Sequence, residues 1–192
     1  MVVNDIPVMP FRTIDEWEKW LEKNHTNSSG IWVKFFKKNS GVQTITYAEA
    51  LDVALCYGWI DSQLKGYDDK AYLQKFTPRK SKSVWSKTNI GHIDRLIKAG
   101  KMRSAGLQLV EEAKKDGTWS QAYDSAKTMV IPDDFMNELS KDKRALEFFK
   151  TLNKTNLYAI GWRLQTARTP ETRVKRMTKI LELLSKGKKL HE

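Results

Sequence analysis

The chain has 192 residues, 40% of them hydrophobic, and a formal net charge of +11. This composition is typical of one globular domain, or of a domain with a helical appendage, that prefers anionic partners. No apolar run approaches the roughly 18 residues that a transmembrane helix needs, and no basic segment followed by an apolar one opens the chain. We therefore expect a cytoplasmic protein without membrane insertion. The single cysteine, Cys56, excludes an internal disulfide and a site built from several thiolates.

The N-terminal part of the chain combines a helical pattern with an extended one. Thr13 and Glu16 have the spacing of a capping box, which predicts a helix that ends near Asn24. Residues 31–37 are rich in β-branched and aromatic side chains, and this composition predicts a strand.

A second capping box, formed by Thr46 and Glu49, precedes a helical segment that is apolar almost all round, residues 47–57. A helix of this kind is normally buried. Gly58 is well placed to end it in a left-handed conformation. Because Cys56 lies in the last turn of this helix, a buried structural thiol is favoured over a nucleophile.

The next segment predicts a β-hairpin at about residues 59–77. Residues 59–65 alternate in character, and residues 66–69 have the composition of a turn. Residues 71–77 then form the returning strand, which Pro78 ends because proline cannot donate to a sheet.

After the hairpin the pattern is helical to the end of the chain. Two helices are predicted at residues 89–99 and 104–115. A third has Pro132 as its first residue, and a fourth is capped by Ser140. A fifth covers residues 156–167, and the last begins at Thr169. The irregular composition of residues 118–129 indicates a boundary. We therefore predict a helix-rich α+β fold with a small antiparallel sheet around the hairpin. A core domain, residues 1–128, carries a helical C-terminal subdomain, residues 129–192, packed on it.

The positive charge is concentrated in two zones. Residues 75–103 carry nine bases, Lys82 among them, against one acid, and residues 156–192 carry nine bases against three acids. Such zones favour anionic partners. A solvated face on a lysine-rich protein is the alternative interpretation of the same pattern.

Asp61 is the main candidate for chemistry, because it follows Trp59 and Ile60 in a predicted strand and an ionised carboxylate is costly to desolvate. If its side chain faces inward, it needs a partner, for which we consider Lys65, Arg79 or a hydroxyl group such as that of Tyr72. The alternative is that Asp61 faces solvent or forms a purely structural ion pair.

A basic loop, residues 78–87, leads to the predicted start of a helix near residues 88–89, and helix N-termini bind anions through their free N–H groups. The hairpin and this loop together form the candidate ligand site, with tryptophan walls and basic donors. Its candidate residues are Tyr57, Trp59, Asp61, Lys65, Arg79, Trp85, Ser86 and Lys87. The histidines are scattered, and no metal ligand, cofactor or catalytic residue is assigned.

Several ordered motifs resemble the YdeI/OmpD-associated family of bacterial proteins. They are YAEAL at residues 47–51, CYGWID at 56–61, YLQKFTPR at 72–79, VWSKTN at 84–89, AKKDGTW at 113–119, QTARTPETR at 165–173 and GKK at 187–189. The resemblance implies a bacterial cytosolic protein linked to protection against bacteriocins or cationic antimicrobial peptides. It implies no enzymatic activity and transfers no catalytic residue.

The sequence leaves four functions open. The first is a module that binds a small anionic ligand or a peptide in stress or antimicrobial-peptide tolerance. The second is a nucleic-acid-binding protein that uses the two basic zones. The third is an enzyme with Asp61 as acid or base, and the fourth is a scaffold that recruits a partner through the C-terminal amphipathic helix.

Overall fold

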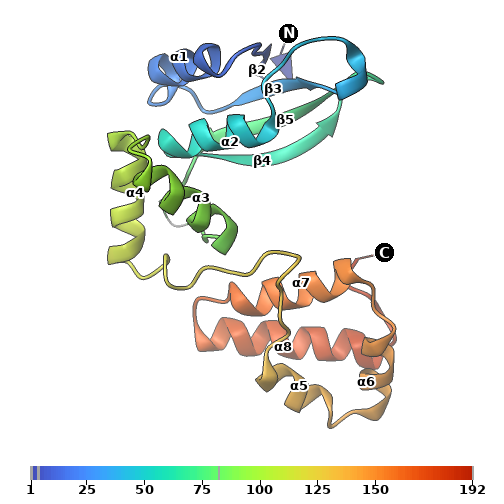
Figure 1. Ribbon diagram of the computed structural model, residues 1–192. Helices are drawn as coiled ribbons and strands as arrows, with labels where there is room; N and C mark the ends of the chain where they lie inside the picture. Colours follow the sequence, from blue (N-terminus) through green and yellow to red (C-terminus); the bar gives the residue numbers. More distant parts are fainter. Residues whose placement is uncertain (1, 4, 82, 192) are drawn as a thin grey trace. The chain divides into compact units, whose positions relative to one another are not determined.

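The computed structural model of the chain describes residues 2–3, 5–81 and 83–191 (Figure 1). It combines α-helices with one mixed sheet, which confirms the α+β class. The chain folds into two compact units. The first comprises Met1–Ser83 and Gly91–Gly117, and the second comprises Val84–Ile90 and Thr118–Glu192. The division after residue 128 and the packing of a helical subdomain on a core remain predictions.

The first unit is built around the sheet. Its elements are β1 (Val2–Val3), β2 (Ile6–Pro10), α1 (Ile14–Asn24), β3 (Ile31–Phe36), a short 3-10 helix (Lys38–Ser40), α2 (Tyr47–Cys56), β4 (Trp59–Gly66), β5 (Ala71–Pro78), most of α3 (Lys87–Lys98) and α4 (Ser104–Lys115). The strand order is β1-β2-β3-β5-β4. The predicted hairpin is confirmed as β4 and β5. The sheet is mixed rather than wholly antiparallel, because β2, which the sequence analysis did not identify, pairs with β3 in parallel.

The helices α1 and α2 pack against one face of the sheet. The ring of Trp17 on α1 lies 5.6 Å from that of Phe76 on β5, and the indole N–H of Trp17 donates to the carbonyl of Ala50 on α2 at 3.0 Å. All three residues are fully buried. This apolar contact gives the first unit its core.

Local capping signals decide where α1 and α2 begin. The box at Thr46 and Glu49 is complete, with each side chain accepting from the other residue's backbone N–H. The box at Thr13 is only half formed: its hydroxyl accepts from Glu16 N, but the Glu16 carboxylate accepts from Arg12 N instead. Both helices nevertheless begin directly after the predicted N-cap residue.

Gly58 ends α2 as predicted, with a φ of 74° that favours glycine. A Cβ atom at this position would also lie 2.7 Å from Leu109 Cδ1 of α4. The tight turn therefore joins the buried helix to β4 while α4 passes close by.

The second unit is helical. Its main elements are α5 (Asp133–Leu139), α6 (Lys143–Lys150), α7 (Lys154–Gln165) and α8 (Pro170–Ser185). Its core consists of Phe135, Leu139, Ala145, Leu152, Ile160, Leu164, Ile180 and Leu184. The predicted helices exist, but three boundaries were wrong.

Side-chain capping explains two of those boundaries, the starts of α6 and α7. Pro132 is the N-cap of α5 rather than its first residue. Ser140 ends α5, and the carboxylate of Asp142 caps α6 by accepting from Ala145 N. Asn153 caps α7, which therefore starts earlier than predicted.

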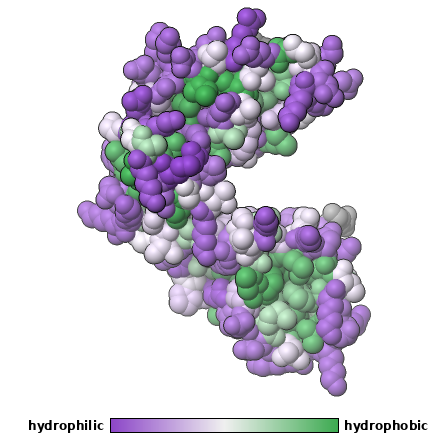
Figure 2. Space-filling model, viewed as in Figure 1, coloured by the Kyte–Doolittle hydropathy of each residue, from purple (hydrophilic) through white to green (hydrophobic). Residues whose placement is uncertain are grey.

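Across the described ranges, no helix has both the length and the apolar character needed to cross a membrane. Figure 2 shows hydrophilic side chains over much of the visible surface of each unit, with hydrophobic areas between them.

Candidate functional site

The two faces of β5 have different chemistry. Phe76 pairs with Ile31 of β3 and points to the helix-covered face, whereas Lys75 pairs with Trp32. Since side chains alternate along a strand, Lys75 and Thr77 point to the opposite face. That face of the hairpin, away from α1 and α2, carries the candidate site.

A basic hollow of about 530 Å³ opens on this face of the hairpin. It is lined by Ser29, Ser62, Gln63, Lys75, Thr77, Pro78, Arg79 and Lys80. Three of these residues are basic, four offer a hydroxyl or amide group, and none of the described lining residues is acidic. A bulge in β4 between Asp61 and Leu64 brings Ser62 opposite β5, where its hydroxyl donates to the carbonyl of Lys75 at 3.4 Å. The hollow is therefore suited to an anion.

A second hollow, of about 380 Å³, adjoins the first through Gln63, which lines both. Its other lining residues are Val3, Trp32, Leu64 and Lys65. Trp32 is only 5% exposed, and its indole N–H has no hydrogen-bond acceptor within the described residues. A buried donor left unpaired costs about 1–3 kcal/mol, so an acceptor atom on a ligand would relieve this cost. We call the two adjoining hollows together the hairpin face.

Arg79 is held at the end of the hairpin by backbone and side-chain contacts. Its N–H donates to the carbonyl of Gly58 at 2.9 Å, and its guanidinium donates to the carbonyl of Ser83 at 3.4 Å. Only 9% of the residue is exposed. The guanidinium thus contributes fixed positive charge to the basic hollow, beside the more accessible Lys75 and Lys80.

Asp61 lies on the helix-covered face rather than on the hairpin face, because it pairs with Phe76. Its partner is Tyr47, the first residue of α2, whose hydroxyl donates to Asp61 Oδ2 at 2.9 Å. Burial raises the pKa of Tyr47 well above its ordinary value, and the neighbouring Asp61 charge raises it further. Lys65, Arg79 and Tyr72 were the partners considered from the sequence. The sequence carried no signal for Tyr47.

Tyr57 and Trp59 are buried in the first unit. Trp59 is 1% exposed, and its indole N–H donates to the carbonyl of His25 at 3.1 Å. The Tyr57 hydroxyl donates to Glu18 Oε1 at 3.4 Å, and the Arg103 guanidinium lies 5.9 Å from the Tyr57 ring centre. Neither side chain lines the hairpin face.

Trp85, Ser86 and Lys87 belong to the second unit, whereas Arg79 belongs to the first. Trp85 is buried with its ring 5.0 Å from that of Trp119. The Ser86 hydroxyl accepts from Asn89 N at 3.1 Å and so caps α3. The predicted convergence of these residues with Arg79 on one anion site stays a prediction.

Several bases of the 75–103 zone are neutralised by nearby carboxylates. Lys87 Nζ lies 2.7 Å from Asp124, and the hydrogen bond from Lys87 is the main cause that lowers the Asp124 pKa. Arg95 and Arg103 likewise pair with the carboxylates of Asp52 and Glu18.

Lys82 lies outside the described residues. Of the bases in this zone, Lys75, Arg79 and Lys80 line the basic hollow.

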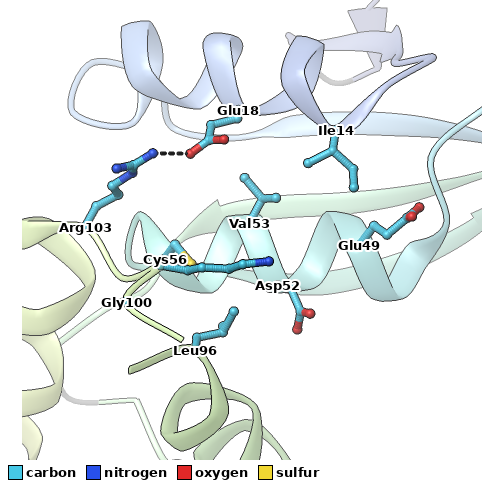
Figure 3. Close-up of a pocket in the computed structure, with 10 residues that line it drawn as sticks. Ile14, Glu18, Glu49, Asp52, Val53, Cys56, Leu96, Gly100 and Arg103 are labelled. Carbon is cyan, nitrogen blue, oxygen red and sulfur yellow. Dashed lines mark hydrogen bonds and ion pairs between the residues drawn. The ribbon is translucent and has the colours of Figure 1, made fainter. Parts of the chain in front are cut away.

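A separate pocket of about 360 Å³ lies along α2 in the first unit (Figure 3). We call it the α2 pocket. Its lining residues are Ile14, Glu18, Glu49, Asp52, Val53, Cys56, Leu96, Gly100, Lys101 and Arg103. Burial raises the pKa of the Cys56 thiol to about 11, with nearby carboxylate charges as further causes. A thiol of this kind is protonated at neutral pH and is a poor nucleophile.

Sites that bind a metal through several His, Cys, Asp or Glu side chains require these residues to cluster. Within the parts of the chain that the structure describes, no group of three or more such residues could hold a metal ion.

Two family models match the chain. Residues 9–109 match the family described as "Domain of unknown function (DUF8412)". Residues 128–187 match the family described as "Bacteriocin-protection, YdeI or OmpD-Associated". The predicted resemblance is therefore confirmed, with its match in the C-terminal part, whereas the hairpin lies within the first model. Searches of curated proteins and of solved structures each found no match to the chain.

Proposed function

We propose that the first unit binds a small anion on the hairpin face. Over residues 9–109 the chain belongs to the family described as "Domain of unknown function (DUF8412)". The residues that line the two hollows lie almost wholly within that range. The observation that carries the proposal is the gathering of Lys65, Lys75, Arg79 and Lys80 around two adjoining hollows, with no acid among the described lining residues. Basic side chains arranged without acids raise the local concentration of anions.

The chemistry of the hollows supports an anion with several acceptor oxygens, such as a phosphate or a polycarboxylate. Lysine binds such groups as a point charge, and arginine can donate two parallel hydrogen bonds. The buried N–H of Trp32 adds a donor that has no acceptor within the described chain. Ser62 and Thr77 add hydroxyl groups at the edge of the basic hollow.

The match of residues 128–187 extends the proposal to physiology. We infer that ligand binding by the first unit serves stress tolerance, and specifically protection against bacteriocins or cationic peptides, in the cytoplasm. A strain that lacks the gene should become more sensitive to such peptides. Complementation with the wild-type gene should restore tolerance, whereas a variant that no longer binds the anion should not.

The binding proposal is tested by calorimetric titration with inorganic phosphate and pyrophosphate at low ionic strength. The double variant Lys75→Gln, Lys80→Gln removes two accessible charges from the basic hollow. We expect pyrophosphate to bind the wild type and to bind the double variant about tenfold more weakly, since each exposed charge pair contributes up to about 1 kcal/mol. Lys70→Gln, at an exposed base in the hairpin turn, is the matched control and should bind as the wild type does.

Trp32→Phe provides an independent test of the binding proposal, because it removes the unpaired indole N–H and keeps an aromatic ring. The variant should bind pyrophosphate more weakly. It breaks no hydrogen bond of the free protein, because the lost N–H has no acceptor within the described residues, but the smaller ring leaves a cavity and lowers the stability somewhat. The absence of binding to the wild type, or equal weakening in Lys70→Gln, would contradict the proposal.

A single-stranded nucleic acid is the second candidate, favoured by the same four bases on the hairpin face. Phosphate-driven binding of this kind weakens steeply as the salt concentration rises. A gel-shift experiment at low salt decides between the two. Retardation that the double variant abolishes would favour nucleic acid over a small anion.

A further inference from the structure

A hollow of about 360 Å³ lies in the second unit, whereas the hairpin face and the α2 pocket belong to the first. We call it the arginine hollow. The helices α7 and α8, which contribute to its wall, lie side by side (Figure 1). Two of its lining residues are basic, and none of those described is acidic. They are Val84, Trp162, Thr166, Arg168, Thr172 and Arg176.

Two neighbouring helix faces form this hollow. Trp162 and Thr166 are four positions apart at the end of α7 and share one face. Thr172 and Arg176 are four positions apart on α8 and share another. Arg176 Nη1 joins the two faces by donating to Thr166 Oγ1 at 3.1 Å, and it also donates to the carbonyl of Arg163 at 2.7 Å. The guanidinium is therefore fixed beside the last turn of α7, which carries Trp162.

Arg176 keeps further donors for a ligand. A guanidinium has five N–H groups, and the two bonds above use only those of Nη1. Among the described residues, its Nε and Nη2 groups have no acceptor. The Thr172 hydroxyl accepts from Thr169 Oγ1 at 3.2 Å, and its own proton likewise has no acceptor in the described chain. Because Arg176 and Thr172 are both half-buried, their unpaired donors favour a ligand with acceptor oxygens.

The rest of the wall is held in place by bonds within the second unit. Tyr123 N donates to the carbonyl of Trp85 at 3.0 Å, and Lys87 N donates to the carbonyl of Tyr123 at 2.9 Å. These bonds hold the segment that begins with Val84. The Tyr123 ring in turn lies 6.2 Å from that of Trp162. The wall is therefore formed before any ligand binds, which lowers the cost of binding.

The charge of the hollow suits a dianion. Its lining residues bring two positive charges, from Arg168 and Arg176. The nearby carboxylate of Asp124 is neutralised by Lys87 at 2.7 Å. A phosphate monoester carries nearly two negative charges at neutral pH and has three strong acceptor oxygens, whereas a carboxylate carries one charge. The hollow therefore favours a phosphate monoester.

Val84 and Trp162 add an apolar side to the hollow. Trp162 is half-buried, so that part of its surface remains open to a ligand. An aromatic ring gains more from contact with an indole than its buried area alone provides. The volume also lies within the range of about 300–1,000 Å³ that is usual for small-molecule sites.

We propose that the arginine hollow binds a phosphate monoester that carries an aromatic ring. Arg176 donates hydrogen bonds to the phosphate oxygens, and Arg168 adds the second positive charge. The ring of the ligand packs against Trp162 and Val84. Because this site lies wholly in the second unit, it does not depend on anion binding at the hairpin face.

The test titrates the full chain with phenyl phosphate and follows the indole N–H signal of Trp162 by NMR. Loss of this signal in Trp162→Phe assigns it, and the signal reports on the arginine hollow rather than on the hairpin face. Methyl phosphate should bind about three- to tenfold more weakly than phenyl phosphate, because it lacks the ring. Benzoate should bind about two- to fivefold more weakly, because it carries a single charge.

Charge-neutral variants test the phosphate contacts. Arg168→Gln changes an exposed residue and should weaken phenyl phosphate binding about two- to fivefold. Arg176→Gln should weaken it about tenfold or more, because it removes hydrogen bonds from a charged donor. Arg176 also binds the end of α7, so thermal denaturation checks that this variant is folded, and Arg168→Gln tests the site without that complication. Lys175→Gln removes an exposed base of α8 outside the hollow and should leave the affinity unchanged.

Adenosine monophosphate distinguishes two sources of the ligand, since its ring is attached through a sugar. Tighter binding of adenosine monophosphate than of phenyl phosphate would assign the hollow to nucleotides, and the reverse order would assign it to aryl phosphates.

The proposal is overturned if phenyl phosphate causes no saturable shift of the Trp162 signal at millimolar concentration. It is also overturned if methyl phosphate or benzoate binds as tightly as phenyl phosphate, or if Lys175→Gln weakens binding as much as Arg168→Gln does.

Discussion

The hydroxyl of Tyr47 donates to Asp61 at 2.9 Å and thereby ties the first turn of α2 to the start of β4. Without the Tyr47 hydroxyl, the Asp61 carboxylate would lose this hydrogen bond on the helix-covered face of the sheet. Tyr47→Phe should therefore lower the free energy of unfolding by about 0.5–1 kcal/mol, a modest value because the pair is partly exposed. Urea denaturation measures this change.

Tyr72→Phe is the control: the Tyr72 ring stacks on Phe35, and among the described residues its hydroxyl forms no hydrogen bond. Equal losses in both variants would contradict the role of the Tyr47 bond.

The raised pKa of Tyr47 predicts a stability loss in alkali. Burial and the Asp61 charge favour the neutral phenol in the folded state, whereas the unfolded chain titrates near its ordinary pKa of 10.0. The folded state thus binds more protons above pH 10, and stability falls as the pH rises through that range. Tyr47→Phe should make the decline less steep. A decline of unchanged slope would show that other tyrosines cause it, since the pKa values of Tyr57 and Tyr72 are also raised by burial.

Cys56 should be chemically inert in the folded protein. Its thiol is buried, and burial raises its pKa to about 11, so that little thiolate exists at pH 7.5. Iodoacetamide labelling should be slow in buffer and fast in concentrated urea. Fast labelling of the native protein would show that the α2 pocket exposes a reactive thiol.

Two glycines should respond to alanine in opposite directions. A Cβ atom on Gly106 of α4 would lie 2.4 Å from the carbonyl oxygen of Cys56, so Gly106→Ala should force α4 away from α2 and destabilise the first unit. Gly91 of α3 has no atom within 4 Å of such a Cβ. Gly91→Ala should stabilise the helix by up to about 1 kcal/mol. Thermal denaturation of both variants checks the sign of each effect.

Arg173 should contribute to the stability of the second unit through its planar geometry. Its guanidinium donates to both carboxylate oxygens of Asp134, at 2.7 and 2.8 Å, and to the carbonyl of Leu164 at the end of α7. Lysine cannot reproduce these bonds, so Arg173→Lys should cost about 1 kcal/mol in urea denaturation. Arg144→Lys, at an exposed position of α6, should cost almost nothing. If the two substitutions have equal effects, the geometry of Arg173 does not matter.

Most local elements of this protein were recognisable from short-range signals in the sequence. The complete capping box at Thr46 and Glu49, the left-handed Gly58 and the hairpin that Pro78 ends were all recognisable, because each depends on residues close together in the chain. The weak strand β2 was missed, since its short sequence with two prolines resembles a loop.

Which of these residues meet depends on strand register and on the packing of the helices against the sheet. Strand register separated Asp61 from Lys75 by turning them to opposite faces of the sheet, and helix packing supplied Tyr47 as the acid's partner. The tertiary structure also buried Trp59 and left the indole N–H of Trp32 at a hollow beside Lys65. A one-residue change of register reverses the face of every side chain on a strand. For that reason Lys65 and Arg79 were recognised as candidates from sequence, but the hairpin face that joins them was not.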